Sequence, residues 1–448
     1  MGVISSKRLV QEEIDALLAP AVDAGRVGLA VSGGIDSMAM LLCFWQWSKA
    51  CGVGLRVFTV DHGLRAEATQ EAQFVADKCA ELGLQHQILR WQGQKPKANI
   101  QGEARAARYA LLEVAARESG CAYLCLAHHR QDQAETFLSR LARGSGVEGL
   151  AAMRVVSRHG TGEVPLFRPF LHVARERLKA TLQAYGWEFV QDPSNENRQY
   201  ERVRLRQSLG DLAQLGLSEA RLDKTARAIG RAADALAFYR QKAERELCQW
   251  HAAGFVQLDC AGLKELPKEI ALRLLASLLR RVGGARYTPR LVQVERLLLA
   301  LCDTRAFSGC ALAGVELRPF TDQTESRVLL CREIGRCGIN PLQLAEGESG
   351  VFDRRFRITA RVPLRVDAFC LSDFSALGVP APRELGLPWP KQAFNGAPLL
   401  VLADGSRYLP WYGAQGVVLH NGGRRDTSTW PADIRPVDVE RDLRSSGD

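Results

Sequence analysis

The sequence predicts an α/β fold with a parallel sheet in its first half, a mainly helical region after it and a small β-rich region at the end. In the first half, short apolar runs alternate with longer amphipathic stretches, the pattern of a parallel sheet covered by helices on both faces. Helical periodicity follows, and from Asn340 onward Pro and Gly become frequent while hydrophobicity alternates. Because 448 residues exceed one ordinary core, we expect three domains, at residues 1–212, 213–338 and 339–448.

The predicted strands of the first domain are short and apolar, and each is followed by a helix. The strands cover residues 26–31, 55–60, 86–91 and 122–127, and the helices cover residues 35–49, 67–82, 100–117 and 131–142. Ligands of such sheets bind at the carboxyl ends of the strands. Polar segments follow three of these strands directly, at Ser32, at residues 61–63 and at residues 128–129. We therefore expect the three segments to lie at the same edge of the sheet.

Residues 210–217 predict a break between the first and second domains. After the break, residues 221–250 predict one long helix, with Leu222 and Ile229 on the same side. The remaining predictions are helices at 270–281 and 291–302, and strands at 311–317, 328–331, 356–362 and 399–403. The residues after Pro436 predict a frayed, charged tail.

The composition describes a globular protein with an excess of basic residues. Hydrophobic residues make up 46% of the chain and charged residues 24%, and the formal net charge is +9. This charge indicates a polyanionic partner, most simply nucleic acid. The sequence contains no long uncharged apolar run of the kind that a membrane span needs, so we expect no membrane partner.

The cysteines and the first residues indicate a cytoplasmic location. The 12 cysteines are scattered and form no C-x-x-C, which favours a reducing compartment and disfavours a cluster or a redox dithiol. The first residues lack the apolar core of a signal peptide. Gly2 and Ser6 match a myristoylation pattern that is short enough to occur often by chance.

The loop between the first predicted strand and its helix reads Ser-Gly-Gly-Ile-Asp-Ser. Two adjacent glycines let the backbone approach a ligand closely, and the first N–H groups of a helix bind phosphate. The plainer alternative is a structural turn with an Asp or Ser cap. The loop is not a Walker A loop because no Gly-Lys-Ser/Thr follows.

This loop matches S-G-G-x-D-S and resembles the PP-loop of enzymes that split ATP into AMP and pyrophosphate. The resemblance implies a Rossmann-like PP-loop ATPase domain with ATP and Mg²⁺ as cofactors. Asp36 would help to place Mg²⁺, a hard cation that prefers carboxylate and phosphate oxygens. The residues expected to bind ATP are Ser32, Gly33, Gly34, Ile35, Asp36 and Ser37.

Five further segments occur in a fixed order over about the first 210 residues, a domain-sized stretch. They are VDHGLR (60–65), NIQGEARAARY (99–109), AHHRQDQAET (127–136), RLARGSGVEGLAAM (140–153) and DPSNENRQYERVRLR (192–206). Together with the PP-loop they resemble the family of tRNA(Ile)-lysidine synthetases. Beyond them the similarity is looser.

The resemblance implies a ligase that acts on tRNA(Ile) with a CAU anticodon and on free lysine. Oxygen O2 of the wobble cytidine attacks the α-phosphate of ATP and pyrophosphate leaves. The lysine ε-amine then attacks C2 and displaces AMP, which gives lysidine and changes codon reading from AUG to AUA. The second and third domains would hold the tRNA body.

The resemblance also assigns roles to side chains of the first domain. Asp132 and Glu135 would bind lysine, and two carboxylates one helical turn apart can recognise its ammonium groups. Arg105 would be catalytic by gripping phosphate or adenylate, with Arg108 a weaker candidate on the same helix face. Both arginines could instead lie on a solvated helix surface. His128 would be catalytic, or it could be a histidine that only packs at a strand end.

The amine that attacks C2 must be neutral, whereas its ordinary pKa is near 10.4. A carboxylate or His128 could accept the proton, and the sequence does not decide between them. A zinc site formed by His128, His129, Asp132 and Glu135 is disfavoured because no further His or Cys cluster completes it.

Basic residues follow the predicted lysine site. Arg140 and Arg143 precede a G-x-G-x-x-G at residues 144–149, which follows a helix rather than a strand and so fails as a dinucleotide fingerprint. We expect a flexible loop there, close to the cytidine, with both arginines on phosphate.

Residues 192–195 open a turn that leads into a run of arginines. Arg202, Arg204 and Arg206 are expected to face RNA or ATP, the alternative being a solvated basic stretch. The family has Asn after the first of these arginines, whereas this chain has Val203, so any polar contact from that position is in doubt.

Two other functions stay open at this point. A tRNA thiolase on the same scaffold would need paired cysteines, which the chain lacks. A non-catalytic nucleotide or RNA binder could carry a relic loop, although Asp36 and Ser37 are intact. The sequence has no coiled-coil heptads and leaves the oligomeric state open, a homodimer being one option.

Overall fold

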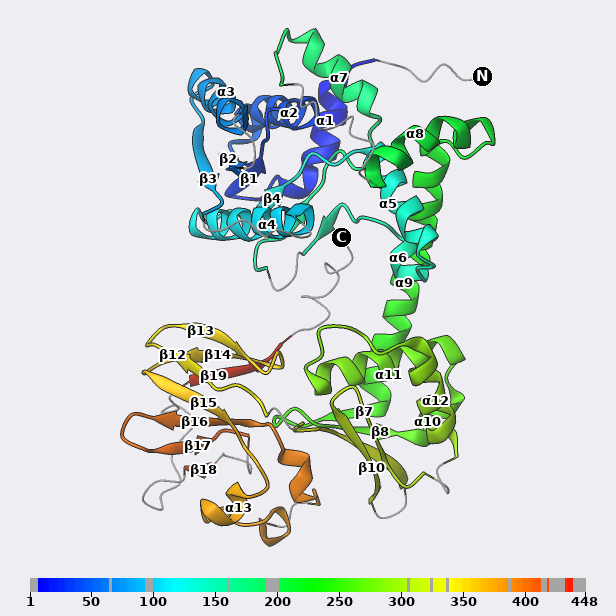
Figure 1. Cartoon of the computed structure of the whole chain (residues 1–448), viewed down its shortest axis with the longest axis vertical. Helices are drawn as coiled ribbons and strands as arrows, with labels where there is room; N and C mark the ends of the chain where they lie inside the picture. The colour runs from blue at the N-terminus through cyan, green and yellow to red at the C-terminus, as the bar shows by residue number, and fades with distance from the viewer. Residues whose placement is uncertain are drawn as a thin grey trace. The chain divides into compact units, whose positions relative to one another are not determined.

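The computed structural model describes residues 7–63, 67–92, 100–158, 162–190, 201–303, 307–322, 325–335, 338–385, 388–411, 417–418 and 432–437. The chain divides into two compact units between Asp234 and Ala235, and Figure 1 gives the elements of each. The expected division into three domains stays a prediction.

The first unit is built on a six-stranded sheet with the order β3-β2-β1-β4-β6-β5. All neighbouring strands are parallel except β5 and β6. Its strands are β1 (Arg26–Ala30), β2 (Gly54–Asp61), β3 (Gln85–Arg90), β4 (Tyr123–Cys125), β5 (Val156–Ser157) and β6 (Leu166–Phe167). The predicted α/β fold with a parallel sheet is confirmed.

Helices cover both faces of this sheet, as Figure 1 shows for α2 and α4. They are α1 (Gln11–Leu18), η1 (Ala19–Ala21), α2 (Ile35–Cys51), α3 (Glu67–Glu81), α4 (Ile100–Glu118), α5 (Arg130–Ala142), α6 (Val147–Leu150), α7 (Arg175–Ala184) and α8 (Glu201–Gln214). The four helices predicted for this region are present, with bounds within two residues of the expected ones.

Alternation along the strands separates two hydrophobic clusters. Leu29 and Val57 pack with α2 and α7, whereas Ala30 and Phe58 pack with α4 on the other face. Helix α2 is buried around most of its circumference, which fixes its N-terminal loop firmly at the carboxyl end of β1. Functional side chains at that edge of the sheet are therefore held on a rigid support.

The break expected at residues 210–217 begins later than predicted. Helix α8 continues through Gly210 to Gln214, because Leu209 is buried against Phe137 of α5 and Leu222. A glycine inside a helix costs only about 1 kcal/mol, and this packing outweighs it. Residues 144–149, expected as a flexible loop, also differ, since residues from Val147 onward form α6.

The long helix predicted at 221–250 is α9 (Glu219–Leu247), and its expected last turn is strand β7 (Cys248–Trp250) instead. Residues of β7 pair with those of β8 (Val256–Asp259). Tertiary pairing thus overrides the helical pattern at that end. Residues 311–317, expected as one strand, are likewise divided, because Ala313 and Gly314 both take positive φ in a turn.

The second unit contains a five-stranded antiparallel sheet with the order β7-β8-β11-β10-β9. Its further elements are α10 (Cys260–Glu265), α11 (Lys268–Gly283), α12 (Leu291–Cys302), β9 (Cys310–Leu312), β10 (Val315–Asp322) and β11 (Glu325–Arg332). The described part of this region is therefore more β-rich than the helical pattern predicted.

Two more sheets, ordered β12-β15-β16-β17-β18 and β13-β14-β19, complete the second unit. Their strands are β12 (Leu342–Leu344), β13 (Ser349–Phe352), β14 (Phe356–Ala360), β15 (Leu364–Ala368), β16 (Pro398–Leu402), β17 (Arg407–Leu409), β18 (Val417–Val418) and β19 (Ala432–Pro436), and short helices are α13 (Asp373–Ala376), η3 (Pro382–Leu385) and η4 (Lys391–Phe394). The β-rich C-terminal region is confirmed. Its predicted charged tail lies outside the described residues.

An aromatic cluster joins the two parts of the second unit. Phe255 of the first part packs against Phe394 and Trp389 of the second, with ring centroids 5.4 and 5.1 Å apart. The ring of His251 stacks on Phe255 at 4.4 Å. Phe255 and Phe394 belong to one hydrophobic cluster that also includes Leu329, and Trp389 packs against it, so both parts share a core.

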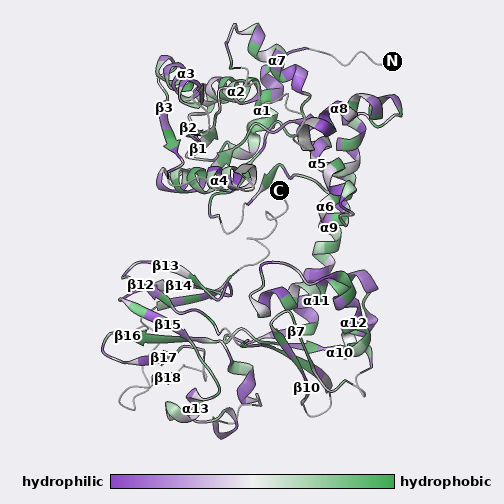
Figure 2. Cartoon of the chain, viewed as in Figure 1, coloured by the Kyte–Doolittle hydropathy of each residue, from purple (hydrophilic) through white to green (hydrophobic). Residues whose placement is uncertain are grey.

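Figure 2 shows polar residues interspersed along the helices of both units. Among the residues that the structure describes, no helix combines the length and the apolar character that crossing a bilayer requires.

Candidate active site

The loop after β1 is closed by its own hydroxyl groups. Ser32 donates its backbone N–H to Ser37 Oγ at 3.1 Å, and Ser37 Oγ donates to the Gly34 carbonyl at 2.9 Å. The two serine Oγ atoms lie 3.3 Å apart. Gly34 is the N-cap of α2, and the first N–H groups of a helix have no partner within it. The loop thus combines hydroxyls and helix N–H groups, which suits an anion.

Backbone contacts fix this loop on both sides. The Gly33 carbonyl accepts a hydrogen bond from the Val190 N–H at 2.9 Å, and Val31 O accepts one from Thr59 Oγ1 at 2.8 Å. Gly33 has φ +84°, and a Cβ there would lie 3.4 Å from Val190 Cγ2. Glycine meets both requirements, a left-handed backbone and a tight approach. The loop geometry is therefore preorganised.

Asp36 in the first turn of α2 contacts two basic side chains. Its carboxylate lies 3.6 Å from His129 Nε2 and 3.3 Å from Arg175 Nε. Burial alone would raise the pKa of Asp36, but the hydrogen bond and charge of His129, together with Arg175, outweigh burial and lower that pKa. Asp36 is therefore held ionised, the form that a hard cation such as Mg²⁺ requires.

His129 bridges Asp36 and Asp132. Its Nε2 lies 3.4 Å from Asp132 Oδ2, and its backbone N–H donates to the same oxygen at 3.0 Å. The His129 side chain is 3% exposed. Burial acts to lower the pKa of His129, whereas Asp36 and Asp132 raise it, and the net change is upward. The PP-loop and the predicted lysine site are thus connected through one histidine.

The histidine that reaches Asp36 is His129, whereas the sequence motif singled out His128. The chain after β4 is extended, so successive side chains point to opposite faces. Cys125 packs on the α2 side of the sheet and Leu126 on the α4 side. Counting on by twos places His129 on the α2 side with Asp36. His128 is half-buried on the alternate side.

Glu135 and Arg206 form an ion pair between α5 and α8. Glu135 Oε1 accepts a hydrogen bond from Arg206 Nε at 2.8 Å, and the Glu135 side chain is 1% exposed against 31% for Arg206. Burial acts to lower the pKa of Arg206, but Glu135, Asp132 and Asp36 raise it, with a net upward change. Three carboxylates therefore act on this one guanidinium.

The contacts described for the other predicted arginines are with residues outside this network. Arg105 of α4 lies over the Tyr109 ring at 5.3 Å. Arg140 donates to the carbonyls of Gly149 and Ala152, both at 3.0 Å. Arg143 caps α5 and is exposed, as is Arg204 on α8.

Some predicted positions lie outside the described residues. The side chains of Arg202 and Val203 are among them, as are residues 191–200 with the turn at 192–195. Residues 64–66 and 93–99, which carry parts of two of the motifs, lie there too.

Two charged residues of the site escaped the sequence motifs. Arg175, the first residue of α7, stands 139 positions from Asp36, and Glu219 accepts a hydrogen bond from Gln131 Nε2 at 3.1 Å. Burial and the nearby Glu176 raise the pKa of Glu219. Neither residue stands in a distinctive spacing, so only the tertiary fold reveals them. The position of His129, in contrast, could have been predicted from the alternation of side chains along the extended chain.

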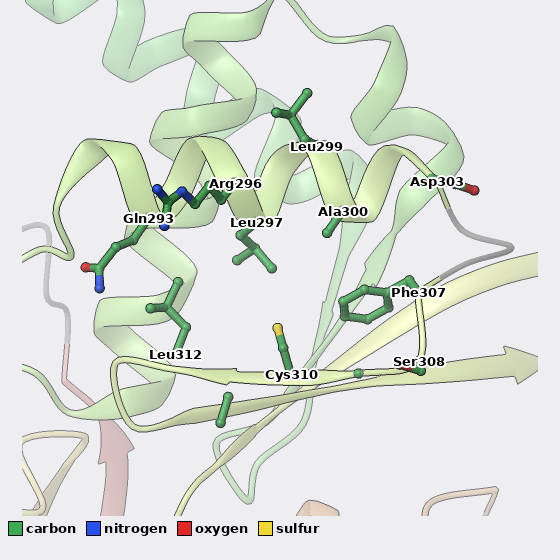
Figure 3. A pocket seen from close by; sticks show the side chains of 12 residues that line it. Gln293, Arg296, Leu297, Leu299, Ala300, Asp303, Phe307, Ser308, Cys310 and Leu312 are labelled. Atoms are coloured by element: carbon green, nitrogen blue, oxygen red, sulfur yellow. The ribbon is translucent and has the colours of Figure 1, made fainter.

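A metal centre and a ligand pocket are two other kinds of site that can be compared with the PP-loop edge. Within the described residues, no group of three or more His, Cys, Asp or Glu side chains is arranged to hold a metal ion. A hollow of about 640 Å³ in the second unit is lined by residues of α12, of β9 and of the segment between them, including Leu297, Cys310 and Phe307 respectively (Figure 3). Its described lining has one cation, Arg296, and one carboxylate, Asp303, which makes it a poorer site for charge chemistry than the PP-loop edge.

Comparison with known proteins agrees with this geometry. The family model described as PP-loop domain matches residues 6–213. The chain is 41% identical over 310 residues to a tRNA(Ile)-lysidine synthase of Ruegeria pomeroyi, covering 69% of this chain and 71% of the relative. It is 44% identical over 310 residues to that of Methylobacterium nodulans, covering 68% and 90%, and 40% identical over 341 residues to that of Bradyrhizobium diazoefficiens, covering 73% and 93%.

These relatives are similar to this chain over most of their own length, and the PP-loop domain matched at residues 6–213 contains the loop, Asp36 and the carboxylates of α5. The comparisons therefore disfavour the tRNA thiolase and the non-catalytic binder, the two functions that the sequence left open. The chain belongs to the tRNA(Ile)-lysidine synthase family of PP-loop, ATP-utilising ligases.

Proposed function

We propose that this protein joins free lysine to C2 of the wobble cytidine of tRNA(Ile) with a CAU anticodon, with release of AMP and pyrophosphate. The product, lysidine, would change codon reading from AUG to AUA. The observation that carries the proposal is the contact chain from Asp36 through His129 to Asp132. It joins a loop suited to a triphosphate to a cluster of carboxylates suited to an ammonium ion.

In the first step, O2 of cytidine forms a bond to the α-phosphorus of ATP. The bond between that phosphorus and the bridging oxygen breaks, and pyrophosphate leaves with the bonding electrons. The N–H groups at the start of α2 and the hydroxyls of Ser32 and Ser37 support this step because they face developing phosphate charge. Asp36 fits Mg²⁺ as one oxygen ligand beside phosphate oxygens, and the ion would neutralise charge on the leaving group. Arg105 is proposed to contact phosphate when substrates are bound.

In the second step, the lysine ε-amine forms a bond to C2 while the bond from C2 to the adenylated oxygen breaks and AMP leaves. Asp132 and Glu135 are proposed to hold the ammonium groups of lysine. The attacking nitrogen must lose a proton, and Asp132 or His128 is the proposed acceptor. His129 lies beside Asp132 and Arg206 lies beside Glu135, so each of the two carboxylates has a basic neighbour.

The tRNA contacts are proposed for exposed basic residues of the first unit and for the second unit. Arg143 and Arg204 are exposed and are suited to phosphate contacts, as is Arg202 from its place in the sequence. Cytidine must leave its stack to reach the site. We also propose a cytoplasmic location, where tRNA, ATP and lysine meet, with a homodimer as one option for assembly.

The test is a reconstitution with tRNA(Ile), ATP, Mg²⁺ and labelled lysine. We expect AMP and pyrophosphate release that depends on both tRNA and lysine, and a wobble nucleoside that is heavier by one lysine less water. A tRNA with an unrelated anticodon is the matched control. Incorporation of sulfur, or ATP binding without products, would contradict the proposal.

A further inference from the structure

The pair formed by Glu135 and Arg206 raises a question about lysine entry. Glu135 Oε1 already accepts a hydrogen bond from Arg206 Nε at 2.8 Å. The carboxylate side chain is 1% exposed, whereas the arginine side chain is 31% exposed. The guanidinium therefore lies on the solvent side of the carboxylate, where a ligand would have to approach.

The helices that carry this pair are held together without it. Ala134 and Phe137 of α5 pack with Leu209 of α8 and with Leu222 and Ala226 of α9 in one hydrophobic cluster. Because this apolar contact fixes α8 on α5, the Arg206 side chain can change its rotamer while the backbone stays in place. Its long stem gives it the freedom to do so.

Charge balance favours a cation at the position beside Glu135 that Arg206 occupies. A buried carboxylate without a cation is strongly unfavourable. Arg206 supplies a cation to Glu135, while His129 and Arg175 contact Asp36. A lysine ammonium carries the same charge and can donate a hydrogen bond to the same oxygen.

Building on the proposed function, we propose that Arg206 occupies the ammonium position at Glu135 until lysine displaces it, and thereby selects for a cationic amino acid. A neutral or acidic amino acid that displaced Arg206 would remove this guanidinium from Glu135 and bring no positive charge in its place. Lysine, in contrast, brings a positive charge of its own in place of the guanidinium that it displaces. Arg206 is in this sense a specificity-determining residue, because it penalises ligands that cannot replace its charge.

The test compares lysine affinities by calorimetry without tRNA. Arg206→Met keeps an apolar stem and removes the competing charge, so we expect lysine to bind about tenfold more tightly than to the wild-type protein. Arg206→Lys keeps a competing cation and should stay near the wild-type affinity. Arg117→Met, an exposed arginine in the last turn of α4 to which no role is assigned, is the matched control and should also leave lysine affinity unchanged.

Added methylguanidinium gives a second readout. It should weaken lysine binding to Arg206→Met by filling the emptied position, and it should leave the wild-type protein unaffected. Weaker or unchanged lysine binding by Arg206→Met, or methylguanidinium competition of equal strength in both proteins, would overturn the inference.

A measurement on the wild-type protein covers the case in which Arg206→Met does not fold. In protein labelled with ¹⁵N-arginine, the Arg206 Nε–H signal, assigned from its loss in Arg206→Lys, should shift and exchange faster with solvent as lysine saturates the site. An Arg206 signal that lysine leaves unchanged would refute displacement. Absence of lysine binding by the wild-type protein, with no lysine-dependent AMP release, would overturn the proposed function as well. Normal lysine binding with an unmoved Arg206 would overturn only this inference.

Discussion

Two histidines, one in each unit, have pKa values shifted in opposite directions. His129 lies between Asp36 and Asp132, and these carboxylates raise its pKa despite burial. His251 lies among aromatic rings, where burial lowers its pKa to about 4. The first unit therefore concentrates opposite charges at the edge of a parallel sheet, and the second excludes charge from an aromatic core. This difference separates the part for which catalysis is proposed from a part that is stabilised by aromatic packing.

The largest expected effect breaks the charge network of the first unit. Asp36→Asn keeps the shape of the side chain but removes the charge that His129 and Arg175 contact, so AMP release should fall by about 100-fold or more. Asp234→Asn is the matched control, because that carboxylate is paired with Arg154 on an exposed surface. Quantified AMP release under single-turnover conditions decides the outcome, and near-normal release by Asp36→Asn would exclude the proposed role.

The next effect concerns the aromatic core of the second unit. Phe394 is fully buried and contacts Phe255 and Trp411 at 5.4 and 5.2 Å between ring centroids. Phe394→Ala should lower the free energy of unfolding of this unit by about 3–5 kcal/mol. Leu299→Ala, at a side chain that is 72% exposed, should change it by less than about 0.5 kcal/mol.

Denaturant titration followed by tryptophan fluorescence measures this change, since Trp389 and Trp411 both belong to the cluster or pack against it. ATP affinity of the folded Phe394→Ala variant should equal that of the wild-type protein. A large loss of ATP affinity at denaturant-free conditions would show that the two units are not separate in the way the histidines indicate.

The pH dependence of stability should have opposite signs in the two units. His251 has an ordinary pKa of 6.5 when unfolded and about 4 when folded, so the unfolded chain binds more protons between these values. The second unit should therefore lose stability as the pH falls from 6.5 towards 4. His129 has a raised pKa in the folded protein, so its contribution is fully present below pH 6.5 and is lost as the pH rises through the folded value.

Unfolding followed between pH 4 and pH 8 without Mg²⁺ tests both directions. His251→Phe should flatten the acid limb of the second unit, because a phenyl ring fills the stacked position on Phe255 without a titrating nitrogen. An unchanged acid limb in that variant would assign the pH dependence to other groups.

Much of the first unit could be predicted from its sequence, and the reason is physical. Alternating apolar runs define β1 to β4, and S-G-G-x-D-S fixes the loop because its backbone conformation needs glycine at position 33. Asp132 and Glu135 could be predicted as a pair from their spacing on a helix. These features depend on local geometry, which the sequence carries directly.

The partners of those carboxylates could not be predicted in the same way. Arg175 reaches Asp36 across 139 positions, and Arg206 reaches Glu135 across 71, so both pairings depend on how α7 and α8 pack. The choice between His128 and His129 depends on which strand face a residue occupies, and a one-residue error reverses it. In the second unit, β7 ends a helical pattern because it pairs with β8.

The smallest expected effects concern two neighbouring arginines, Arg140 and Arg143, for which the sequence predicted the same role on phosphate. Arg140 donates to the carbonyls of Gly149 and Ala152, so Arg140→Met should destabilise the first unit by about 1–2 kcal/mol without altering the salt dependence of tRNA binding.

Arg143 is exposed at the end of α5, so Arg143→Met should leave stability within about 0.5 kcal/mol and weaken tRNA binding about threefold, with a salt slope reduced by about 1. Thermal unfolding and tRNA titrations at several salt concentrations measure both quantities in both variants. The opposite assignment, with stability lost at Arg143 and the salt slope changed at Arg140, would mean that the carbonyl contacts of Arg140 give way to phosphate when tRNA binds. Because each variant removes one guanidinium from the same helix end, only the difference in what the two side chains contact can produce opposite readouts.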